Sequence, residues 1–583
     1  MDAIRGLSRR IMGLPHGLSV HPGGIVIAPT AIDRYAPVQE AAKRIASPLH
    51  PRELRPVRIT QYDKDGVKDA GLVKLDLLGN RNLSTVRAAC ELLRQRQVTI
   101  DPDSLPPADP ATIRTLRSAG TVGCNQLESP AMRNLLAMLA PSHVRDVMKA
   151  LALIRPGAAS VGMKEVFVRR HRRLEAPPAG HPQADAILRD TYGVMLYEDD
   201  VMLVAAALLG GSLSEGDRFR KAVQKCRDDG QRLELSRQFL ARCRREGVDG
   251  EYAKDVWVQM AKFNAYSFCR AHAASYAVLA YAGAYLKTHH PLAFWTAALN
   301  NNQSMYHRRV YVEQAKRVGI RFLGPHVNRS EAEFGIDRPG GGEPAGAEGI
   351  RVGLGGLAGL GPAGVAGILE ARASGPFAGL TDLLARTGLG REPARALVLC
   401  GAFDATGRRR PELMIELDLF FGPGGRRVSR AATLLPASPV VPGLGGDYPE
   451  PRKYADQWRI LGFSLGEHVM ARYRRRLAGA VDADSRHLAG RVGRRVRIAG
   501  VLEAHRTTPA RRGGTVRFLT LDDEHGLFEA TVLPGVMPAG GQAGLGRYGP
   551  YVVTGEVESQ YGAVTISARR VSLYRPAVAA EAS

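Results

Sequence analysis

The chain has 583 residues, enough for about three to five domains of ordinary size, and 45% of them are hydrophobic, which excludes a disordered or fibrous protein. Lysine and arginine outnumber the acidic residues by 80 to 57, for a formal net charge of +23. This excess favours nucleic acid as the binding partner, with an anionic membrane as the second choice. A GC-rich genome would also raise the arginine count. No apolar run is long enough to cross a membrane and the N-terminus lacks the apolar core of a signal peptide, so we expect a cytoplasmic protein that does not associate with membranes.

The first two segments of the chain differ in the spacing of their apolar residues. Residues 1–95 mix short β-type runs with a closing helix and indicate an α/β piece, with strands expected at 24–28, 57–61 and 71–78 and the helix at 83–96. From 96 to 325 apolar residues recur three and four positions apart, as at Val201, Val204 and Leu208. This spacing predicts a large, mostly helical domain.

Glycine and proline mark the later boundaries. Pro325 and the glycine-rich stretch 339–349 introduce a segment, 326–421, that is typical of short helices joined by tight turns, and residues 422–489 are expected to form a linker followed by a helical segment. Residues 490–575 alternate apolar and polar positions. The strands are predicted at 496–501, 516–521, 527–533, 551–557 and 564–566, which suggests a small barrel of the oligonucleotide-binding type.

The six cysteines are scattered without a CxxC pair, so we expect neither a zinc cluster nor a disulfide framework; they are Cys90, Cys124, Cys226, Cys243, Cys269 and Cys400.

The segment 61–83 carries the first candidate chemistry. Lys74 and Asp76 stand two positions apart in a predicted strand, so their side chains point to the same face. A carboxylate and an ammonium are each costly to bury alone, and a partner or a metal ion is therefore expected. The simpler alternative is an ion pair at the end of the strand.

Six blocks of sequence, in one fixed order, resemble those of bacterial DNA polymerase III alpha subunits, the C-family polymerases. The segment 61–83 ends in Leu-Gly-Asn-Arg-Asn-Leu, which is similar to the family's palm turn. The other blocks are His21-Pro-Gly-Gly-Ile-Val-Ile, Asn125-Gln-Leu-Glu-Ser, Leu153-Ile-Arg-Pro-Gly, Tyr192-Gly-Val-Met-Leu-Tyr-Glu-Asp-Asp-Val-Met (family Tyr-Gly-x-x-x-Tyr-Gln-Glu-Gln-Val-Met) and Phe263-Asn-Ala-Tyr-Ser-Phe-Cys-Arg-Ala-His-Ala-Ala-Ser-Tyr-Ala.

The resemblance runs from about residue 5 to the end and implies the C-terminal portion of such a subunit. The implied fold class is multidomain α+β: the remainder of a polymerase-beta-like palm (1–95), mostly α-helical fingers (96–325), a tandem helix-hairpin-helix domain (326–421), a linker with a helical segment (422–489) and a C-terminal barrel (490–575). The last of the six blocks looks closer to an error-prone paralogue than to a main replicative enzyme.

The resemblance implies a nucleotidyltransferase that joins a deoxynucleoside triphosphate to a primer 3′ hydroxyl with two Mg²⁺ ions. Asp76 would be one of three metal-binding palm aspartates and Lys74 a neighbour of the phosphates. The residues implied to contact the incoming nucleotide are Arg155, Arg220, Lys221, Lys225, Arg270 and His272. Each of them, without the surrounding motif, would more simply be a solvated charge or a core histidine.

Two departures from the family pattern bear on activity. The family run Leu-Arg-Arg-Ala-Met-Gly-Lys-Lys appears as Phe219-Arg-Lys-Ala-Val-Gln-Lys-Cys, so Lys221 replaces an arginine and Gln224 a glycine, which predicts altered triphosphate binding. The family's Pro-Asp-x-Asp motif lies far upstream of the histidine block, whereas only 20 residues precede His21. We therefore expect two of the three carboxylates and the N-terminal phosphoesterase-like domain to be missing, and the chain to be inactive alone.

The accessory segments predict DNA contacts. Gly359 and Gly361 belong to a hydrophobic-Gly-x-Gly hairpin, whose backbone amides would bind DNA phosphate, with a plain helical corner as the alternative; 397–403 is expected to begin a second unit. In the barrel, five aromatic residues could stack on unpaired bases, namely Phe518, Phe528, Tyr548, Tyr551 and Tyr561. Most of them are expected in the core instead, and Tyr548 and Tyr561, beside glycines in turns, are the better candidates. Arg495, Arg497 and Arg517 would follow a nucleic-acid backbone.

A peptide beginning at Glu416, with the sequence Glu-Leu-Asp-Leu-Phe-Phe, resembles the motif with which polymerases bind a sliding clamp, through Leu419 and Phe420. We favour the alternative, an amphipathic helix, because a glutamate replaces the anchoring glutamine. The expected partners are thus primer–template DNA, deoxynucleoside triphosphates and single-stranded template, and the resemblance adds a sliding clamp and a separate N-terminal polymerase half as candidates. Two rival interpretations are a non-catalytic DNA-binding subunit and one half of a split polymerase.

Overall fold

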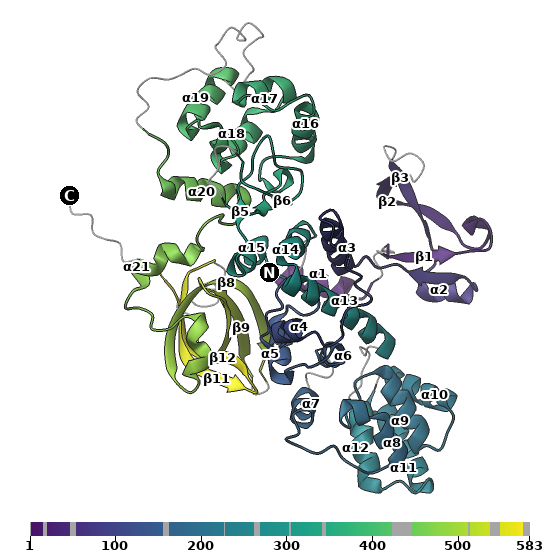
Figure 1. Cartoon of the computed structure of the whole chain (residues 1–583). Coiled ribbons are helices and arrows are strands. Elements are labelled where there is room, and N and C mark those ends of the chain that lie inside the picture. The colour runs from purple at the N-terminus through teal and green to yellow at the C-terminus, as the bar shows by residue number, and fades with distance from the viewer. Residues whose placement is uncertain are drawn as a thin grey trace. The chain divides into compact units, whose positions relative to one another are not determined.

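The computed structural model describes residues 2–14, 20–21, 23–46, 54–154, 162–226, 228–261, 269–301, 305–340, 346–422, 446–510, 513–536 and 548–574. The chain divides into two compact units, Met1–Arg81 and Asn82–Ser583, which are described separately (Figure 1). No described helix combines the length and the apolar character needed to cross a membrane. All six cysteines are free thiols, as expected.

The first unit is a small α/β assembly built on two antiparallel strand pairs. Its elements are α1 (Asp2–Ile11), β1 (Gly24–Ile27), β2 (Val38–Ala46), β3 (Leu54–Thr60), α2 (Lys64–Asp69) and β4 (Val73–Asp76). β1 pairs with β4, and β2 pairs with β3. A small core of Ala36, Val67 and Leu72 packs α2 beside the β1–β4 pair, and Asp63 caps α2 by accepting a hydrogen bond from the Gly66 amide.

The second unit begins with a helical body. Its helices are α3 (Arg81–Arg94), α4 (Pro110–Arg117), α5 (Pro130–Leu139), α6 (Val144–Leu153), α7 (Met163–His171), α13 (Arg270–His289), α14 (Pro291–Asn300) and α15 (Arg308–Arg317). α3 contributes Val86, Ala89 and Leu93 to the core of this body. The boundary between the units therefore falls before this helix, at 81, and not after it at the expected position 95.

A buried lysine helps to fix the loop that precedes α5. The Lys287 ammonium on α13 donates to the carbonyl oxygens of Gly120 and Val122, at 2.6 Å in both cases, and lies 4.9 Å from the centre of the Trp295 ring. Burial lowers the pKa of Lys287. The two carbonyls offset part of that desolvation cost by accepting charge-assisted hydrogen bonds.

A second group of helices has its own core and carries the candidate nucleotide residues. It consists of α8 (Pro182–Ile187), the short helix η3 (Arg189–Thr191), α9 (Glu198–Leu208), α10 (Leu213–Lys225), α11 (Asp229–Arg245) and α12 (Gly250–Ala261). Val204, Phe239 and Met260 lie in this core. α9 and α10 approach so closely at Gly216 that a Cβ there would lie 2.3 Å from the Met202 carbonyl oxygen, so only glycine fits.

The region after α15 consists of short helices beside a three-stranded sheet. The strands, in the order β5-β7-β6, are Phe322–Leu323, Gly349–Arg351 and Gly335–Asp337. The helices are η4 (Leu354–Gly356), α16 (Pro362–Arg372), α17 (Leu380–Thr387), α18 (Arg391–Cys400), η5 (Asp404–Thr406), α19 (Arg410–Phe421) and α20 (Glu450–Leu461). This arrangement agrees with the short helices and tight turns expected for 326–421.

The C-terminal strands form a sheet that closes on itself. They are β8 (Arg495–Pro509), β9 (Thr515–Asp522), β10 (Leu527–Val532), β11 (Tyr551–Gln560) and β12 (Ala563–Leu573), preceded by η7 (Val469–Tyr473), α21 (Arg474–Leu477) and η8 (Ser485–Arg491). Each strand predicted from the sequence overlaps one of them. The order is β10-β12-β11-β8-β9, β9 also pairs with β10, and only the β10–β12 pair is parallel.

Ion pairs join these strands to the helical body. Arg309 on α15 lies 2.9 Å from Glu503, and Arg317 on the same helix lies 2.7 Å from Asp522. Arg133 on α5 lies 3.6 Å from Glu529. Burial raises the pKa of Glu503 to about 7, which shows how far this carboxylate is removed from water. These arginines are committed to holding the protein together.

Candidate nucleotide and nucleic-acid sites

The end of β4 places the two palm candidates in contact. The Lys74 ammonium donates to Asp76 Oδ1 at 2.5 Å, as two side chains on one face of a strand can. His21 Nδ1, which accepts the Gly23 amide, lies 3.9 Å from the same oxygen. The hydrogen bond from Lys74 lowers the pKa of Asp76 below its usual range. Asp76 is therefore a carboxylate at neutral pH, already paired with a cation.

Asp76 is the right type of ligand for a divalent ion, but one carboxylate is too few to hold two of them. Carboxylate oxygens are the ligands that Mg²⁺ prefers, and two ions in one site require several of them. Among the residues that the structure describes, no three acidic, histidine or cysteine side chains are grouped so that they could hold a metal ion. Asp76 can therefore supply one ligand, and the described residues do not complete the site.

In the fingers, Arg220 on α10 is the most strongly engaged of the predicted nucleotide contacts. Its Nε and Nη2 donate to Asp217 Oδ1 at 3.0 and 2.8 Å. Its Nη1 donates to Glu198 Oε2 at 3.1 Å and to Gln224 Oε1 at 3.0 Å. The Arg220 side chain is only 17% exposed. Its charge is thus balanced by two carboxylates.

Of two more predicted contacts, Lys221 lies on α10, and Arg270 lies at the start of α13 but contacts the same helical group. Lys221 Nζ lies 2.7 Å from the second oxygen of Asp217, and the hydrogen bonds from Lys221 and then Arg220 lower the pKa of that carboxyl. Arg270, at the start of α13, donates its backbone amide to Asp199 at 2.6 Å. Its guanidinium lies 3.5 Å from Asp190 and over the Tyr197 ring.

The remaining predicted contacts of the fingers are less constrained. Lys225 is exposed near the end of α10, and His272 is exposed in the first turn of α13, where its ring lies against Tyr276 at 4.6 Å. Arg155 lies outside the described residues. The structure therefore brings Arg220 on α10 and the start of α13 at Arg270 to neighbouring carboxylates, Glu198 and Asp199, in the first turn of α9.

The hairpin predicted before α16 is a tight glycine turn that leads into the helix. Gly359 has φ of +91°, a conformation that favours glycine, and Gly361 has φ of −73° and ψ of 169° at the N-cap of α16. Both glycines are exposed, whereas Leu360 between them is 5% exposed. The hairpin thus presents its backbone to solvent at the positive end of a helix dipole.

A second hairpin with the same geometry precedes α18. Gly388 has φ of +70°, Gly390 has φ of −75° and ψ of 170° at the N-cap of α18, and Leu389 is 8% exposed. The two hairpins are adjacent: a Cβ on Gly364 would lie 2.8 Å from Leu360 and 3.1 Å from Leu389.

The sequence analysis placed the second unit at 397–403, which is the end of α18. The repeated Gly-Leu-Gly at 359–361 and 388–390 was the signal that could have found it.

The predicted aromatic contacts of the barrel are covered by other groups. Tyr548 packs between Arg309, 4.3 Å from its ring centre, and Trp458, and burial raises the pKa of its hydroxyl. Tyr561, in the β11–β12 turn, lies beside Arg172, the residue that follows α7, and Arg172 also donates to the carbonyl oxygen of Tyr561 at 2.7 Å. Neither ring is placed for stacking on a base in this arrangement.

Phe518, which the sequence predicts less strongly as a stacking residue, is better placed for stacking than Tyr548 and Tyr561. It is 43% exposed on β9, whereas Phe528 and Tyr551 are buried. Its cross-strand neighbours are Arg506 on β8 and Thr531 on β10. Alternation along β9 explains the difference, since Leu519 and Leu521 fill the core and Phe518 points the other way.

The predicted barrel arginines differ in their surroundings. Arg495 is exposed at the start of β8, and Arg497 is exposed but lies 3.2 Å from Asp482. Arg517 is half-buried on the side of β9 that faces the core, by the same alternation. Of the three, Arg495 is the most accessible to a nucleic-acid backbone.

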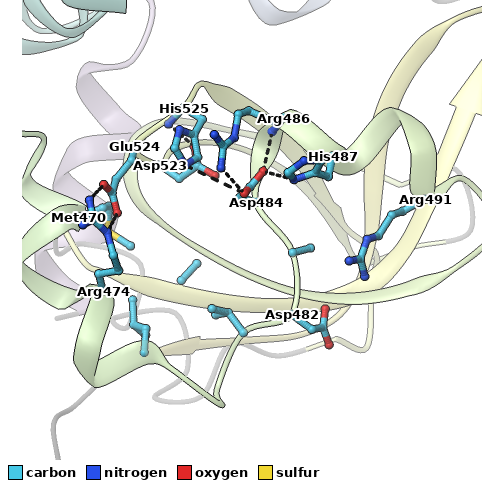
Figure 2. A pocket seen from close by; sticks show the side chains of 14 residues that line it. Met470, Arg474, Asp482, Asp484, Arg486, His487, Arg491, Asp523, Glu524 and His525 are labelled. Carbon is cyan, nitrogen blue, oxygen red and sulfur yellow. Dashed lines mark hydrogen bonds and ion pairs between the residues drawn. The ribbon is translucent and has the colours of Figure 1, made fainter.

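A cavity of about 620 Å³ lies between η7, α21, η8 and the β9–β10 turn (Figure 2). Asp484 lies between Arg486 at 3.0 Å and His487 at 2.9 Å, and Glu524 pairs with Arg474. The cavity's acids and bases therefore largely balance one another, and its contacts join the segment before the barrel to the barrel itself.

The clamp-like peptide lies in a packed helix. Glu416 on α19 is 3% exposed and accepts hydrogen bonds from the Thr381 amide at 2.9 Å and hydroxyl at 2.6 Å, at the start of α17. Arg408 pairs with its other oxygen at 3.2 Å. Leu419 is 47% exposed and Phe420 is half-buried against Phe421. The structure therefore supports the amphipathic helix and assigns Glu416 a structural contact.

Comparison with protein families gives three matches. Residues 1–79 match the bacterial DNA polymerase III alpha NTPase domain, residues 82–247 match the bacterial DNA polymerase III alpha subunit finger domain, and residues 319–413 match a helix-hairpin-helix motif.

Curated relatives cover nearly the whole chain. An error-prone DNA polymerase of Symbiobacterium thermophilum is 32% identical over 613 residues, covering 97% of this chain and 54% of the relative. The DNA polymerase III subunit alpha of Bacillus subtilis is 30% identical over 560 residues (92% and 47%), and that of Escherichia coli K12 is 30% identical over 563 residues (91% and 46%). The chain spans about half the length of the curated relatives it matches.

The geometry of Glu416 generates a stability prediction. Glu416→Ala in the full chain is expected to lower the melting temperature, because it leaves the Thr381 amide and Arg408 without their buried acceptor, at a cost of about 1–3 kcal/mol. Leu419→Ala, at an exposed position of the same helix, should change it little. Thermal unfolding followed by circular dichroism measures both. Equal melting temperatures for Glu416→Ala and the unmodified chain would show that Glu416 is not a structural contact.

Proposed function

The chain belongs to the bacterial DNA polymerase III alpha family, whose members are DNA-directed DNA polymerases, and we propose that it contributes fingers and DNA-binding elements to template-directed DNA synthesis in replication or error-prone repair. The observation that carries the proposal is that Arg220 on α10 pairs with Glu198, and that the backbone amide of Arg270 on α13 donates to the next residue, Asp199, in the first turn of α9. Both α9 and α10 lie inside the segment matched to the finger domain.

In this proposal the fingers bind the triphosphate of the incoming nucleotide. Guanidinium groups bind phosphate oxygens through paired hydrogen bonds, and Arg220 and Arg270 would provide them, with Lys221 and Lys225 as further cations. His272 and Arg155 complete the set that the family resemblance implies. Their role is to orient the nucleotide and to balance its charge, which is most of what a protein contributes to phosphoryl transfer.

The two hairpins would bind the phosphate backbone of duplex DNA. Exposed backbone amides at the N-termini of α16 and α18 attract phosphate oxygens without reading the base sequence. Gly359 and Gly361, with Gly388 and Gly390, keep side chains away from the approach. Two adjacent hairpins can contact a duplex at neighbouring phosphates.

The closed five-stranded sheet fits an oligonucleotide-binding barrel, since one parallel pair in an otherwise antiparallel, closed sheet of five strands matches a Greek-key barrel of that type. We assign it the single-stranded template. Phe518 would stack on a base, while Arg506 and Arg495 would follow the backbone. A clamp contact through Leu419 and Phe420 has no support in the geometry of α19.

The palm strand would supply one carboxylate. In the family, two Mg²⁺ ions activate the primer 3′ hydroxyl and neutralise the leaving pyrophosphate. Asp76 fits as one ligand, and Lys74 holds it ionised. The cytoplasmic location expected from the sequence stays a prediction.

The surroundings of Asp76 favour two alternatives to a chain that is catalytically complete by itself. Asp76 is paired with Lys74, and the described part of the chain contains no grouped metal ligands. The chain would then be a non-catalytic DNA-binding subunit or one half of a split polymerase whose second chain supplies the remaining carboxylates.

The first prediction for this function concerns catalysis. The 583-residue chain by itself is expected to bind primer–template DNA but not to extend the primer, because the residues that the structure describes group no further metal ligands with Asp76 and one carboxylate cannot position two metal ions. Gel analysis of primer extension with Mg²⁺ and all four nucleotides measures this, with Asp76→Ala as the control for contaminating polymerase. Templated incorporation that disappears in Asp76→Ala would contradict the prediction.

The second prediction concerns the hairpins. Gly361→Glu and Gly390→Glu are each expected to weaken duplex binding about tenfold, because each places a carboxylate beside a phosphate where the backbone leaves room for it. Gly379→Glu is the matched control, since Gly379 also begins a helix with open space around it but lies outside both hairpins.

Fluorescence anisotropy of labelled duplex, repeated over a salt series, gives the affinities. Binding should be independent of base sequence, and its logarithm should fall steeply with the logarithm of salt concentration. Equal losses in all three variants would argue against specific contact by the hairpins.

A further inference from the structure

The strongest unexplained feature of the fingers is the set of groups around Arg220. Four of its five N–H bonds are directed at acceptors of the protein itself, two of them at Glu198 and Gln224 through Nη1. A nucleotide triphosphate would need these same N–H groups. The protein's own acceptors therefore compete with the ligand proposed for this residue.

The two acceptors of Nη1 are both departures from the family pattern. Glu198 stands where the matching block of the family has glutamine, and Gln224 stands where the family run has glycine. They are 26 positions apart in sequence, on α9 and α10, and both reach the same nitrogen. One departure adds a negative charge and the other adds an acceptor, so both oppose binding of an anion to Arg220.

Glu198 lies in the first turn of α9 with Asp199 and Asp200, where a carboxylate interacts favourably with the helix dipole. Asp200 is committed to the amides of Leu196 and Tyr197, and burial raises its pKa to about 6. The Glu198 side chain is 28% exposed, so a ligand from solvent can reach it. Asp217, the other carboxylate on Arg220, is exposed to a similar extent but also pairs with Lys221.

The Glu198–Arg220 pair is not needed to join α9 to α10. The two helices already meet in the close contact at Gly216, and Phe219 on α10 stacks on Phe239 of the group's core with ring centres 5.3 Å apart. A partly exposed ion pair adds little to such packing. A role in ligand affinity therefore explains the Glu198–Arg220 pair better than a role in holding α9 and α10 together.

We propose that Glu198 is an intramolecular competitor for the triphosphate on Arg220, assisted by Gln224, and that this competition sets a weak nucleotide affinity in this chain. The inference rests on the proposed nucleotide role of Arg220. A triphosphate carries more charge than one carboxylate and can displace Glu198, whereas a ligand with a single phosphate competes less well. The site would therefore fill only at high nucleotide concentration and would favour triphosphates over monophosphates.

The test is equilibrium binding of dATP, with Ca²⁺ in place of Mg²⁺, to the full 583-residue chain. Glu198→Gln is expected to tighten binding about three- to tenfold, because it removes the competing charge of a partly exposed pair while keeping the side-chain shape. Arg220→Ala should weaken binding. In Glu198→Gln combined with Arg220→Ala, the gain from Glu198→Gln should disappear, since the competitor acts only through Arg220.

Two further measurements separate competition from other effects. Asp229→Asn is the matched control, because Asp229 is 98% exposed on α11 and pairs with Arg232, so it removes one negative charge away from Arg220. Inorganic tripolyphosphate should show the same gain as dATP, which locates the effect on the phosphates. Gln224→Ala should give a smaller gain, and it serves as the second variant if Glu198→Gln fails to fold.

The outcomes are distinct. Unchanged or weaker dATP binding in a folded Glu198→Gln, with Arg220→Ala still weakening it, would overturn the competitor role and leave the proposed function in place. A gain equal to that of Asp229→Asn would also overturn it. Binding that is insensitive to Arg220→Ala would remove both the inference and the assignment of Arg220 to the nucleotide.

Discussion

Pairing between arginines and carboxylates decides which cations of this chain can bind an anion. The sequence has a formal net charge of +23, but the structure commits many of its arginines internally. Arg309 and Arg317 join the barrel to α15 through buried acids, and Arg220 is balanced by two carboxylates in the fingers. A buried ion pair is costly to break from one side, because the remaining partner is left uncompensated. The net charge alone therefore overestimates the positively charged surface that is available to DNA. That surface lies where lysines and arginines are not paired with acidic residues.

The two hairpins can attract a phosphate without using a charged side chain. At Gly359–Gly361 and Gly388–Gly390 the backbone itself faces solvent, and the leucine between each pair of glycines anchors the turn in the core. Because the amides and the helix dipole are fixed by the fold, no side-chain entropy is lost when phosphate binds. In the proposed function the fingers differ, since there a nucleotide would have to displace a carboxylate from Arg220. The chain would then combine a preformed backbone site for DNA with a nucleotide site whose cations are already paired.

Local patterns predicted much of this structure. Alternation predicted all five barrel strands, and the left-handed Gly359 followed from the need for a tight turn. The ion pair of Lys74 with Asp76 follows from a spacing of two in a strand. The remaining features depend on contacts between distant segments, which periodicity does not report. Tyr561 is covered by Arg172, Tyr548 by Arg309 and Trp458, and Glu416 by Thr381 and Arg408. The second hairpin lies at Gly388–Gly390, where Gly-Leu-Gly repeats the first, and not at 397–403, where the apolar residues belong to the buried end of α18.

The central claim is that the hairpins contact DNA and that the fingers contact a nucleotide selected by the template. Hydrogen exchange of the full chain, alone, with primer–template DNA, and with DNA plus a Ca²⁺–nucleotide complex, tests both parts in one measurement. DNA alone should protect amides around Gly359–Gly361 and Gly388–Gly390. The nucleotide complementary to the first unpaired template base should add protection on α10 and at the start of α13, whereas a non-complementary nucleotide should not. Protection that avoids both hairpins, or that is the same on α10 for all four nucleotides, would contradict the account.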